Sequence, residues 1–144
     1  MWGKDFKRTL DYLTGRNDLD QSKIGYFGWS WGAIVGAIIP AIDERIKVVI
    51  VTGGGLTLQV PLPEVDQLNY LPRINQPFLS LNGKYDHFFP LESSQKPMLD
   101  LLGTPSEYKK YLSYETTHQV PRNELIKESL DWLDKYFGNP TIIK

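Results

Sequence analysis

The stretch Gly28-Trp29-Ser30-Trp31-Gly32 decides how this chain folds. Residues 23–27, directly before it, end an apolar run, and residues 33–39, directly after it, are small or branched apolar residues. This order predicts a β-strand, a sharp turn with Ser30 at its apex, and a helix. In so tight a turn, a Cβ at either glycine would meet neighbouring backbone.

Ser30 is the candidate nucleophile of this turn. A serine held in strained geometry between a strand and a helix projects its hydroxyl above the sheet. The amide of Trp31, at the start of the helix, would point at the same space and could stabilise a negatively charged oxygen. A Gly-x-Ser-x-Gly pentapeptide occurs by chance in roughly one chain in twenty of this length. The prediction therefore rests on the strand and helix that flank the motif, and the alternative is a glycine-rich turn with an exposed serine.

The composition is that of one globular domain, which we place over residues 1–144. The chain has 41% hydrophobic and 23% charged residues, and no apolar stretch is long enough to span a bilayer. Its net charge of −1 gives no support for nucleic acid or a membrane as a partner. The absence of cysteine excludes disulfides and a cysteine nucleophile. The first residues lack a hydrophobic signal core, so the cytoplasm is the expected compartment.

Strand and helix patterns alternate along the chain. The predicted helices cover residues 1–14, 31–41, 91–102 and 122–137, and the predicted strands cover 23–28, 47–52, 77–83 and 107–114. Such alternation implies right-handed parallel crossovers. We therefore predict an α/β fold with a mostly parallel sheet of about four strands flanked by helices.

Local patterns within these elements predict which parts are buried. The strand over 47–52 is apolar without alternation, which predicts burial on both faces, whereas the strand over 107–114 should be more exposed. Pro97 should interrupt or restart the helix over 91–102. Residues 53–76 form a long connection of few periodic signals. The amphipathic helix over 122–137 is predicted to line one face with Leu125, Ile126, Leu130, Leu133 and Phe137.

Two polar residues follow the later strands at the positions where an acid and a base are needed. A serine hydroxyl is a poor nucleophile unless a base removes its proton. In parallel sheets, active groups gather beyond the carboxyl ends of the strands. Asp86 lies three residues beyond the strand over 77–83, and His118 lies four beyond the strand over 107–114. We expect His118 to accept the proton of Ser30, and Asp86 to orient the imidazole and stabilise its charged form.

Other assignments of the acid and the base remain open at this point. Asp86 alone could be a solvated turn residue, and His118 alone an exposed loop histidine. His87 is the rival base, although adjacent side chains on an extended loop usually point apart. Glu92 and Glu115 are weaker rivals for the acid, and Glu92 also suits the start of a helix.

Three aromatic residues are candidates for contact with a substrate: Trp29, Tyr70 and Phe88. Aromatic residues are more often part of a core, so each has that alternative. Two histidines without cysteine or ligand spacing make no metal-ligand set, and we expect no metal and no other cofactor. Gly53-Gly54-Gly55 lacks the Lys-Ser/Thr that follows a phosphate-binding loop, which favours a flexible turn.

These motifs resemble the α/β-hydrolase superfamily, and within it the branch similar to dienelactone hydrolases and prolyl oligopeptidases. The matching segments are Asp11-Tyr12-Leu13 with Asp20, the stretch 23–32, Leu81 to Asp86 with Phe89-Pro90, and Thr116-Thr117-His118 before the last helix. The resemblance implies Ser30 as nucleophile, Asp86 as acid, His118 as base and Trp31 as one oxyanion donor. Gln119 stands where such families usually have glycine, Ala33 stands where they often have a second glycine, and dienelactone hydrolases proper use cysteine where this chain has Ser30.

The resemblance covers nearly the whole chain but corresponds only to the C-terminal half of the family's fold. The other half supplies the strand that pairs with the strand before Ser30, and the loop that gives a second oxyanion amide. An unpaired apolar edge invites association. We therefore expect a homo-oligomer, pairing with a missing N-terminal half, or a fragment of a longer protein.

The resemblance implies a serine hydrolase that cleaves a carboxylic ester of a small molecule through an acyl-enzyme. The near alternative is a peptidase acting on peptide amides, and acyl transfer to an acceptor other than water is a third. A different class of function is also open: a catalytically impaired fragment or interaction module that keeps the three residues without a complete oxyanion hole.

Overall fold

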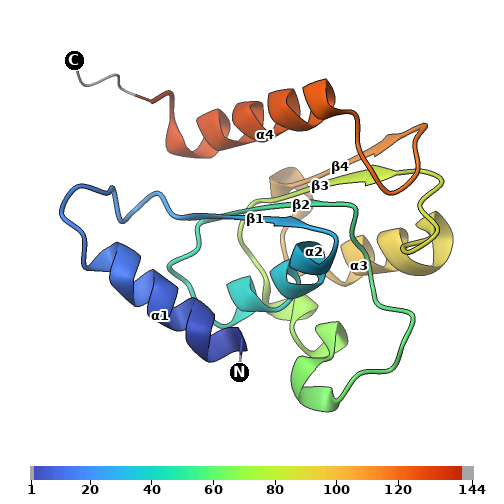
Figure 1. Cartoon of the computed structure of the whole chain (residues 1–144), viewed down its shortest axis with the longest axis horizontal. Helices are drawn as coiled ribbons and strands as arrows, with labels where there is room; N and C mark the ends of the chain where they lie inside the picture. The colour runs from blue at the N-terminus through green and yellow to red at the C-terminus, as the bar shows by residue number, and fades with distance from the viewer. Residues whose placement is uncertain (1, 141–144) are drawn as a thin grey trace.

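The computed structural model describes residues 2–140, and four strands within them form one sheet (Figure 1). The strands are β1 (Gly25–Trp29), β2 (Val48–Thr52), β3 (Phe78–Gly83) and β4 (Lys109–Tyr114). They lie in the order β1-β2-β3-β4, and every neighbouring pair is parallel. The predicted α/β class and the predicted number of strands are confirmed.

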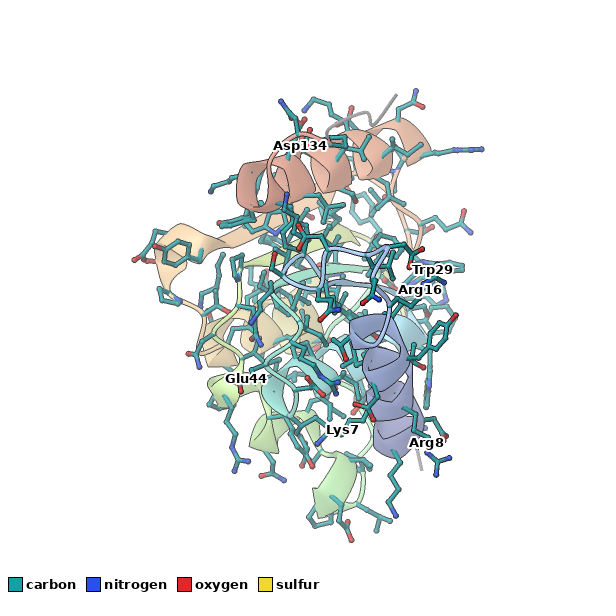
Figure 2. All side chains as sticks on the ribbon, turned by 90° about the vertical axis from the view of Figure 1, so that its left-hand side faces the viewer. Lys7, Arg8, Arg16, Trp29, Glu44 and Asp134 are labelled. Atoms are coloured by element: carbon teal, nitrogen blue, oxygen red, sulfur yellow. The ribbon has the colours of Figure 1, made fainter. Side chains whose placement is uncertain are left out.

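Helices cover both faces of the sheet. α1 (Trp2–Thr14), α2 (Trp31–Gly36) and α3 (Lys96–Leu101) lie on one face, and α4 (Arg122–Phe137) lies on the other (Figure 1). Figure 2 shows the same layers from the side, with Asp134 on α4 and with Lys7 and Arg8 on α1. This layering places hydrophobic clusters above and below the strands.

The burial of β2 follows from these two clusters. Val49 and Val51 belong to the cluster under α1–α3, whereas Val48 and Ile50 belong to the cluster under α4. Because successive side chains of a strand point to opposite faces, a strand covered on both faces is apolar throughout. β4 is only partly buried along its length, as its lysines predicted.

The helix predicted over 31–41 is shorter in the structure. α2 ends at Gly36, and a separate 3₁₀ turn covers Ile39–Ala41. Pro40 has no N–H to donate to the carbonyl of residue 36, so the helix cannot continue through it. The small residues of this stretch favour a helix through Ala41, but Pro40 prevents it.

Pro97 restarts the helix predicted over 91–102. The segment opens with a π-helical turn, η5 (Leu91–Gln95), and α3 follows from Lys96. Proline is well suited to the first turn of a helix, where its missing N–H has no intrahelical partner. The long connection over 53–76 contains only three 3₁₀ turns: Pro63–Val65, Gln67–Asn69 and Leu71–Arg73.

The buried face of α4 differs from the predicted one. Trp132 and Glu128 are buried, whereas Ile126 and Leu130 are 47% and 55% exposed. Trp132 packs with Leu125, Leu133 and Phe137, which keep their predicted place. The large indole and a paired carboxylate turn the helix so that two aliphatic residues face outward. No helix in the described part of the chain is long and apolar enough to cross a membrane.

The outer edge of β1 has no neighbouring strand within residues 2–140. Along β1, the buried Tyr26 and Gly28 alternate with exposed residues. Phe27 and Trp29 on the exposed side are 55% and 50% accessible. The strand that leads to Ser30 therefore presents free backbone groups and aromatic side chains at one edge of the sheet.

Candidate active site

Ser30 has an unusual backbone conformation. Its φ of 54° and ψ of −108° make it the one non-glycine residue with positive φ in the described range. The Ser30 N–H donates to the carbonyl of Thr52 at 3.0 Å, and its own carbonyl accepts from the N–H of Ala33 at 2.9 Å. Hydrogen bonds on both sides thus hold a strained conformation of the kind found at functional turns.

The two glycines of the turn have different roles. A Cβ at Gly28 would overlap the carbonyl of Gly32, as the sequence predicted. A Cβ at Gly32 would meet only the hydroxyl of Tyr26, at 3.9 Å. The prediction that both positions exclude a side chain is therefore wrong for Gly32, because its Cβ direction leads into open space.

Tyr26 fastens the turn to β1. Its hydroxyl donates to the carbonyl of Gly32 at 2.6 Å. Burial raises the pKa of Tyr26 to about 12, so the phenol stays protonated and keeps donating. Gly36 adds to this fit, because a Cβ there would lie 2.7 Å from the Tyr26 ring and 2.9 Å from Val51. α2 is thereby held against β1 both in its first turn and at its last residue.

The structure brings Ser30, His118 and Asp86 into one chain of hydrogen bonds. His118 Nε2 lies 2.8 Å from Ser30 Oγ, and His118 Nδ1 lies 2.8 Å from Asp86 Oδ2. The three residues come from the segments that follow β1, β4 and β3. Because a carboxylate only accepts, Nδ1 carries the hydrogen, and Nε2 is left to accept the proton of the Ser30 hydroxyl. This arrangement can move a proton from a serine to an imidazole.

Asp86 is buried and fully hydrogen-bonded. Its residue is 3% exposed, and Oδ1 accepts from the N–H groups of Phe88 at 2.9 Å and Phe89 at 3.2 Å. With Oδ1 occupied in this way, Oδ2 is left for His118. Backbone donors thus stabilise the carboxylate and fix the direction of its second oxygen.

The rival residues are engaged elsewhere. His87 is exposed, and its ring contacts the ring of Phe88 at 4.1 Å. Glu92 pairs with Lys96 at 2.5 Å. Glu115 accepts from Lys84 at 2.7 Å and from the hydroxyl of Tyr85 at 2.5 Å. None of the hydrogen bonds found within residues 2–140 joins these three rivals to Ser30.

Two of the three predicted substrate-contact residues lie beside His118. The ring of Trp29 is 5.9 Å from the imidazole, and the ring of Phe88 is 5.0 Å from it. Trp29 lies at the periphery of the molecule in Figure 2. Tyr70 instead donates to the carbonyl of Glu64 within its own segment at 2.7 Å. None of the hydrogen bonds or ring contacts found in the described part of the chain joins the Tyr70 side chain to Ser30 or His118.

The sequence did not point to two glycines whose lack of a side chain lets the segment that carries His118 pack closely. A Cβ at Gly53, where φ is +56°, would lie 2.8 Å from the carbonyl oxygen of His118 and 3.2 Å from its ring. A Cβ at Gly83 would overlap the carbonyls of Thr116 and Thr117. Gly53 belongs to a glycine triplet, and no pattern in the sequence connects that triplet with a histidine far along the chain.

A hollow of about 270 Å³ lies beside the exposed edge of β1. Its lining combines aromatic and aliphatic residues with one arginine: Phe27, Trp29, Thr52, Gln119, Val120, Arg122 and Leu125. Within residues 2–140, no group of three or more histidine or acidic residues could hold a metal ion.

The fold is similar to those of several solved hydrolases. A cold-adapted esterase from an Arctic intertidal metagenomic library has a TM-score of 0.75 and 24% identity, over 92% of this chain and 56% of its own. An acetyl xylan esterase from Paenibacillus sp. R4 has a TM-score of 0.77 and 19% identity, over 92% of this chain and 51% of its own. A 2,6-dihydroxy-pseudo-oxynicotine hydrolase has a TM-score of 0.73 and 20% identity, over 94% of this chain and 46% of its own. No family model matches the sequence, and no curated protein does.

These likenesses establish the fold. The described residues form part of an α/β-hydrolase fold, and the predicted resemblance is confirmed at that level. The chain spans about half the length of these solved proteins.

Proposed function

We propose that this chain carries the reacting residues of a serine hydrolase that cleaves a carboxylic ester of a small molecule. The observation that supports the proposal most directly is the continuous chain of hydrogen bonds from Ser30 through His118 to Asp86. The positive φ of Ser30 supports it independently. Most residues with a Cβ avoid this conformation, and a nucleophile held above a sheet requires it.

In the proposed reaction, the hydroxyl oxygen of Ser30 attacks the acyl carbon of the ester. The serine proton passes to Nε2 of His118, and Asp86 stabilises the imidazolium. The tetrahedral intermediate collapses, the bond to the alcohol breaks, and His118 returns the proton to the leaving oxygen. Water then attacks the acyl-enzyme with the same base, releases the acid and restores Ser30.

The amide of Trp31 is the proposed donor to the negatively charged oxygen of the intermediate. It stands at the first residue of α2, one position after Ser30. The positive end of a helix and its N–H groups favour negative charge. A second donor has to come from a segment beside β1, and losing one such donor typically lowers turnover about 10²- to 10³-fold.

An ester is the favoured substrate, and a peptide amide is the alternative. An amide carbonyl is more strongly stabilised by resonance than an ester carbonyl, and its nitrogen must be protonated before it can leave. An ester therefore tolerates an incomplete oxyanion site better. Trp29 and Phe88 flank His118 and are exposed, so they would contact the acyl or leaving group. We retain Tyr70 as a proposed substrate contact from its sequence position alone.

We also propose that the edge of β1 binds a further polypeptide. Phe27 and Trp29 are about half exposed beside unpaired backbone groups, and such an edge is a template for strand pairing. The partner is either a second copy of this chain or a segment that completes the sheet. The hollow beside β1 would then be covered, which would exclude water from the site.

A binding module is the second candidate function, and the open hollow beside the β1 edge favours it. Without a second oxyanion donor, the chain would bind partners through this edge and keep Ser30, His118 and Asp86 as a site without turnover.

Treatment with a fluorophosphonate probe, followed by mass spectrometry, separates these functions. We expect covalent labelling at Ser30, and no labelling in Ser30→Ala or His118→Ala, because the first lacks the nucleophile and the second lacks the base. Ser93→Ala is the control, since Ser93 is an exposed serine outside the site. A folded wild-type chain that stays unlabelled would reject the hydrolase and favour the binding module.

A further inference from the structure

The loop that carries Asp86 is held by a buried side chain that the reaction itself does not use. Gln95, the last residue of η5, is 0% exposed. Its Nε2 donates to the carbonyl of Gly83 at 2.9 Å and to the carbonyl of Phe89 at 2.7 Å. These two carbonyls lie at the first and last residues of the loop 83–89. One amide group therefore closes the loop around Asp86.

The orientation of this amide is fixed from the opposite side. The hydroxyl of Tyr111, on β4, donates to Oε1 of Gln95 at 2.7 Å. Burial raises the pKa of Tyr111, so the phenol remains a donor. Because carbonyls only accept and the phenol donates, a single orientation of the amide satisfies all three bonds.

The hydrogen bonds of Gln95 are linked to the Asp86–His118 pair through Phe89. The N–H of Phe89 donates to Oδ1 of Asp86, while its carbonyl accepts from Gln95. Gln95 thus fixes the residue that binds one oxygen of the Asp86 carboxylate, and this fixes the direction of the oxygen that bonds to His118. A displacement of about 1 Å in such an arrangement can slow a reaction roughly 10²-fold.

We propose that Gln95, oriented by Tyr111, is a positioning residue that sets the geometry of the Asp86–His118 pair. The inference rests on the proposed function for its kinetic consequence, but the geometry it concerns exists whether or not Ser30 turns over an ester. The side chain of Gln95 bonds to Gly83, Phe89 and Tyr111 and to neither Ser30 nor His118, so it acts through the loop.

The test compares Gln95→Met and Tyr111→Phe with a matched control, Thr104→Val. Methionine keeps the size of glutamine and removes its hydrogen bonds. Thr104 is also buried, and two backbone carbonyls, those of Ile74 and Gln76, share its single hydroxyl hydrogen. The residue precedes β4 at the other end of the sheet. Two quantities are measured on the folded chains: the low-field NMR resonance of the His118 Nδ1 proton, and the rate of fluorophosphonate labelling at Ser30.

For Gln95→Met we expect the low-field resonance to shift or disappear and labelling to slow roughly 10- to 100-fold. For Tyr111→Phe, which removes one orienting hydrogen bond, we expect a smaller shift and a loss of roughly 3- to 10-fold. Thr104→Val should leave both quantities at the wild-type value even where it lowers the melting temperature, because a purely structural loss does not reach the pair.

An unchanged resonance and labelling rate in folded Gln95→Met would overturn the inference. If Gln95→Met does not fold, Tyr111→Phe decides, and wild-type values in that variant would overturn the inference equally. A wild-type chain that shows the low-field resonance but does not label would reject the hydrolase, while the resonance in the variants would still decide the role of Gln95.

Discussion

At position 30, the chain adopts a conformation that residues with a Cβ avoid, and the neighbouring residues are shaped to hold it there. Gly28 gives the room for the carbonyl of Gly32, and Tyr26 ties that carbonyl down through its hydroxyl. The contribution of each neighbour can be measured, because only one of the two glycines is sterically required.

Substitution of the two glycines should have opposite effects. Gly28→Ala places a Cβ on the backbone of Gly32 and should lower the free energy of unfolding by about 2–4 kcal/mol. Gly32→Ala adds a methyl group with open space around it and a better helix former, so it should be neutral or stabilising by about 0.5 kcal/mol. Urea unfolding of both variants measures this. Equal losses in the two variants would contradict the assignment.

The residues that sequence could and could not identify differ in one physical respect. Ser30, Asp86 and His118 follow strands, and parallel strands bring their ends together, so their proximity followed from topology. Gly53 acts through contact with the loop that follows β4, and Gln95 acts through hydrogen bonds to the loop 83–89 that precedes it. Such contacts depend on the path of each loop, which hydrophobic periodicity does not encode.

At the scale of elements, hydrophobic pattern located all four strands and α4, but it misjudged how helices end and turn. α2 stops where Pro40 cannot donate to the carbonyl of Gly36. α4 buries Glu128 in place of Ile126, because the carboxylate reaches Lys110 of β4 at 2.6 Å. An apolar count treats a paired carboxylate as polar and therefore assigns it to the wrong face.

This ion pair gives α4 a pH-dependent contribution to stability. Hydrogen bonds from Lys110 and then Lys127 lower the pKa of Glu128. A carboxyl whose folded pKa is lowered stabilises the fold above its unfolded pKa, and that stability is lost as the pH falls through the folded pKa. Glu128→Gln should lower the free energy of unfolding by about 1 kcal/mol at neutral pH. The loss should become smaller below about pH 4, because an unfolded glutamate becomes protonated there.

Urea unfolding at a series of pH values measures this difference. Asp131→Asn is the control on the same helix, because Asp131 is exposed and lies 3.6 Å from Lys127. We expect its effect to be close to zero at every pH. A Glu128→Gln effect that stays constant from neutral to acid pH would show that packing, and not charge, accounts for the loss.

At the scale of the whole molecule, the sheet is covered on both faces but open at its β1 edge. Helices and loops cover its faces, yet β1 lies at an edge with two aromatic side chains exposed. Comparable solved proteins extend well beyond the part that this chain covers. The open edge is therefore the place where association should be sought.

Association through β1 can be tested with charge substitutions. We expect the sedimentation coefficient of the wild-type chain to rise with concentration, and that of Phe27→Lys to stay constant, because a lysine on an edge opposes pairing. Val60→Lys is the control, since Val60 is 97% exposed on a different segment. It should sediment like the wild type. A wild-type chain that is a monomer at every concentration would exclude self-association and leave a different completing segment as the partner.

The close packing at Gly83 also determines how the site can move. Gly83 lies against the carbonyls of Thr116 and Thr117, and the N–H groups of Lys84 and Tyr85 donate to the segment that leads to His118. The loops that carry the acid and the base are thus joined backbone to backbone, whereas Ser30 is anchored to the end of β2. We therefore expect local thermal opening to lengthen the Ser30–His118 distance more readily than the Asp86–His118 distance, so that the acid and the base stay paired when the serine returns.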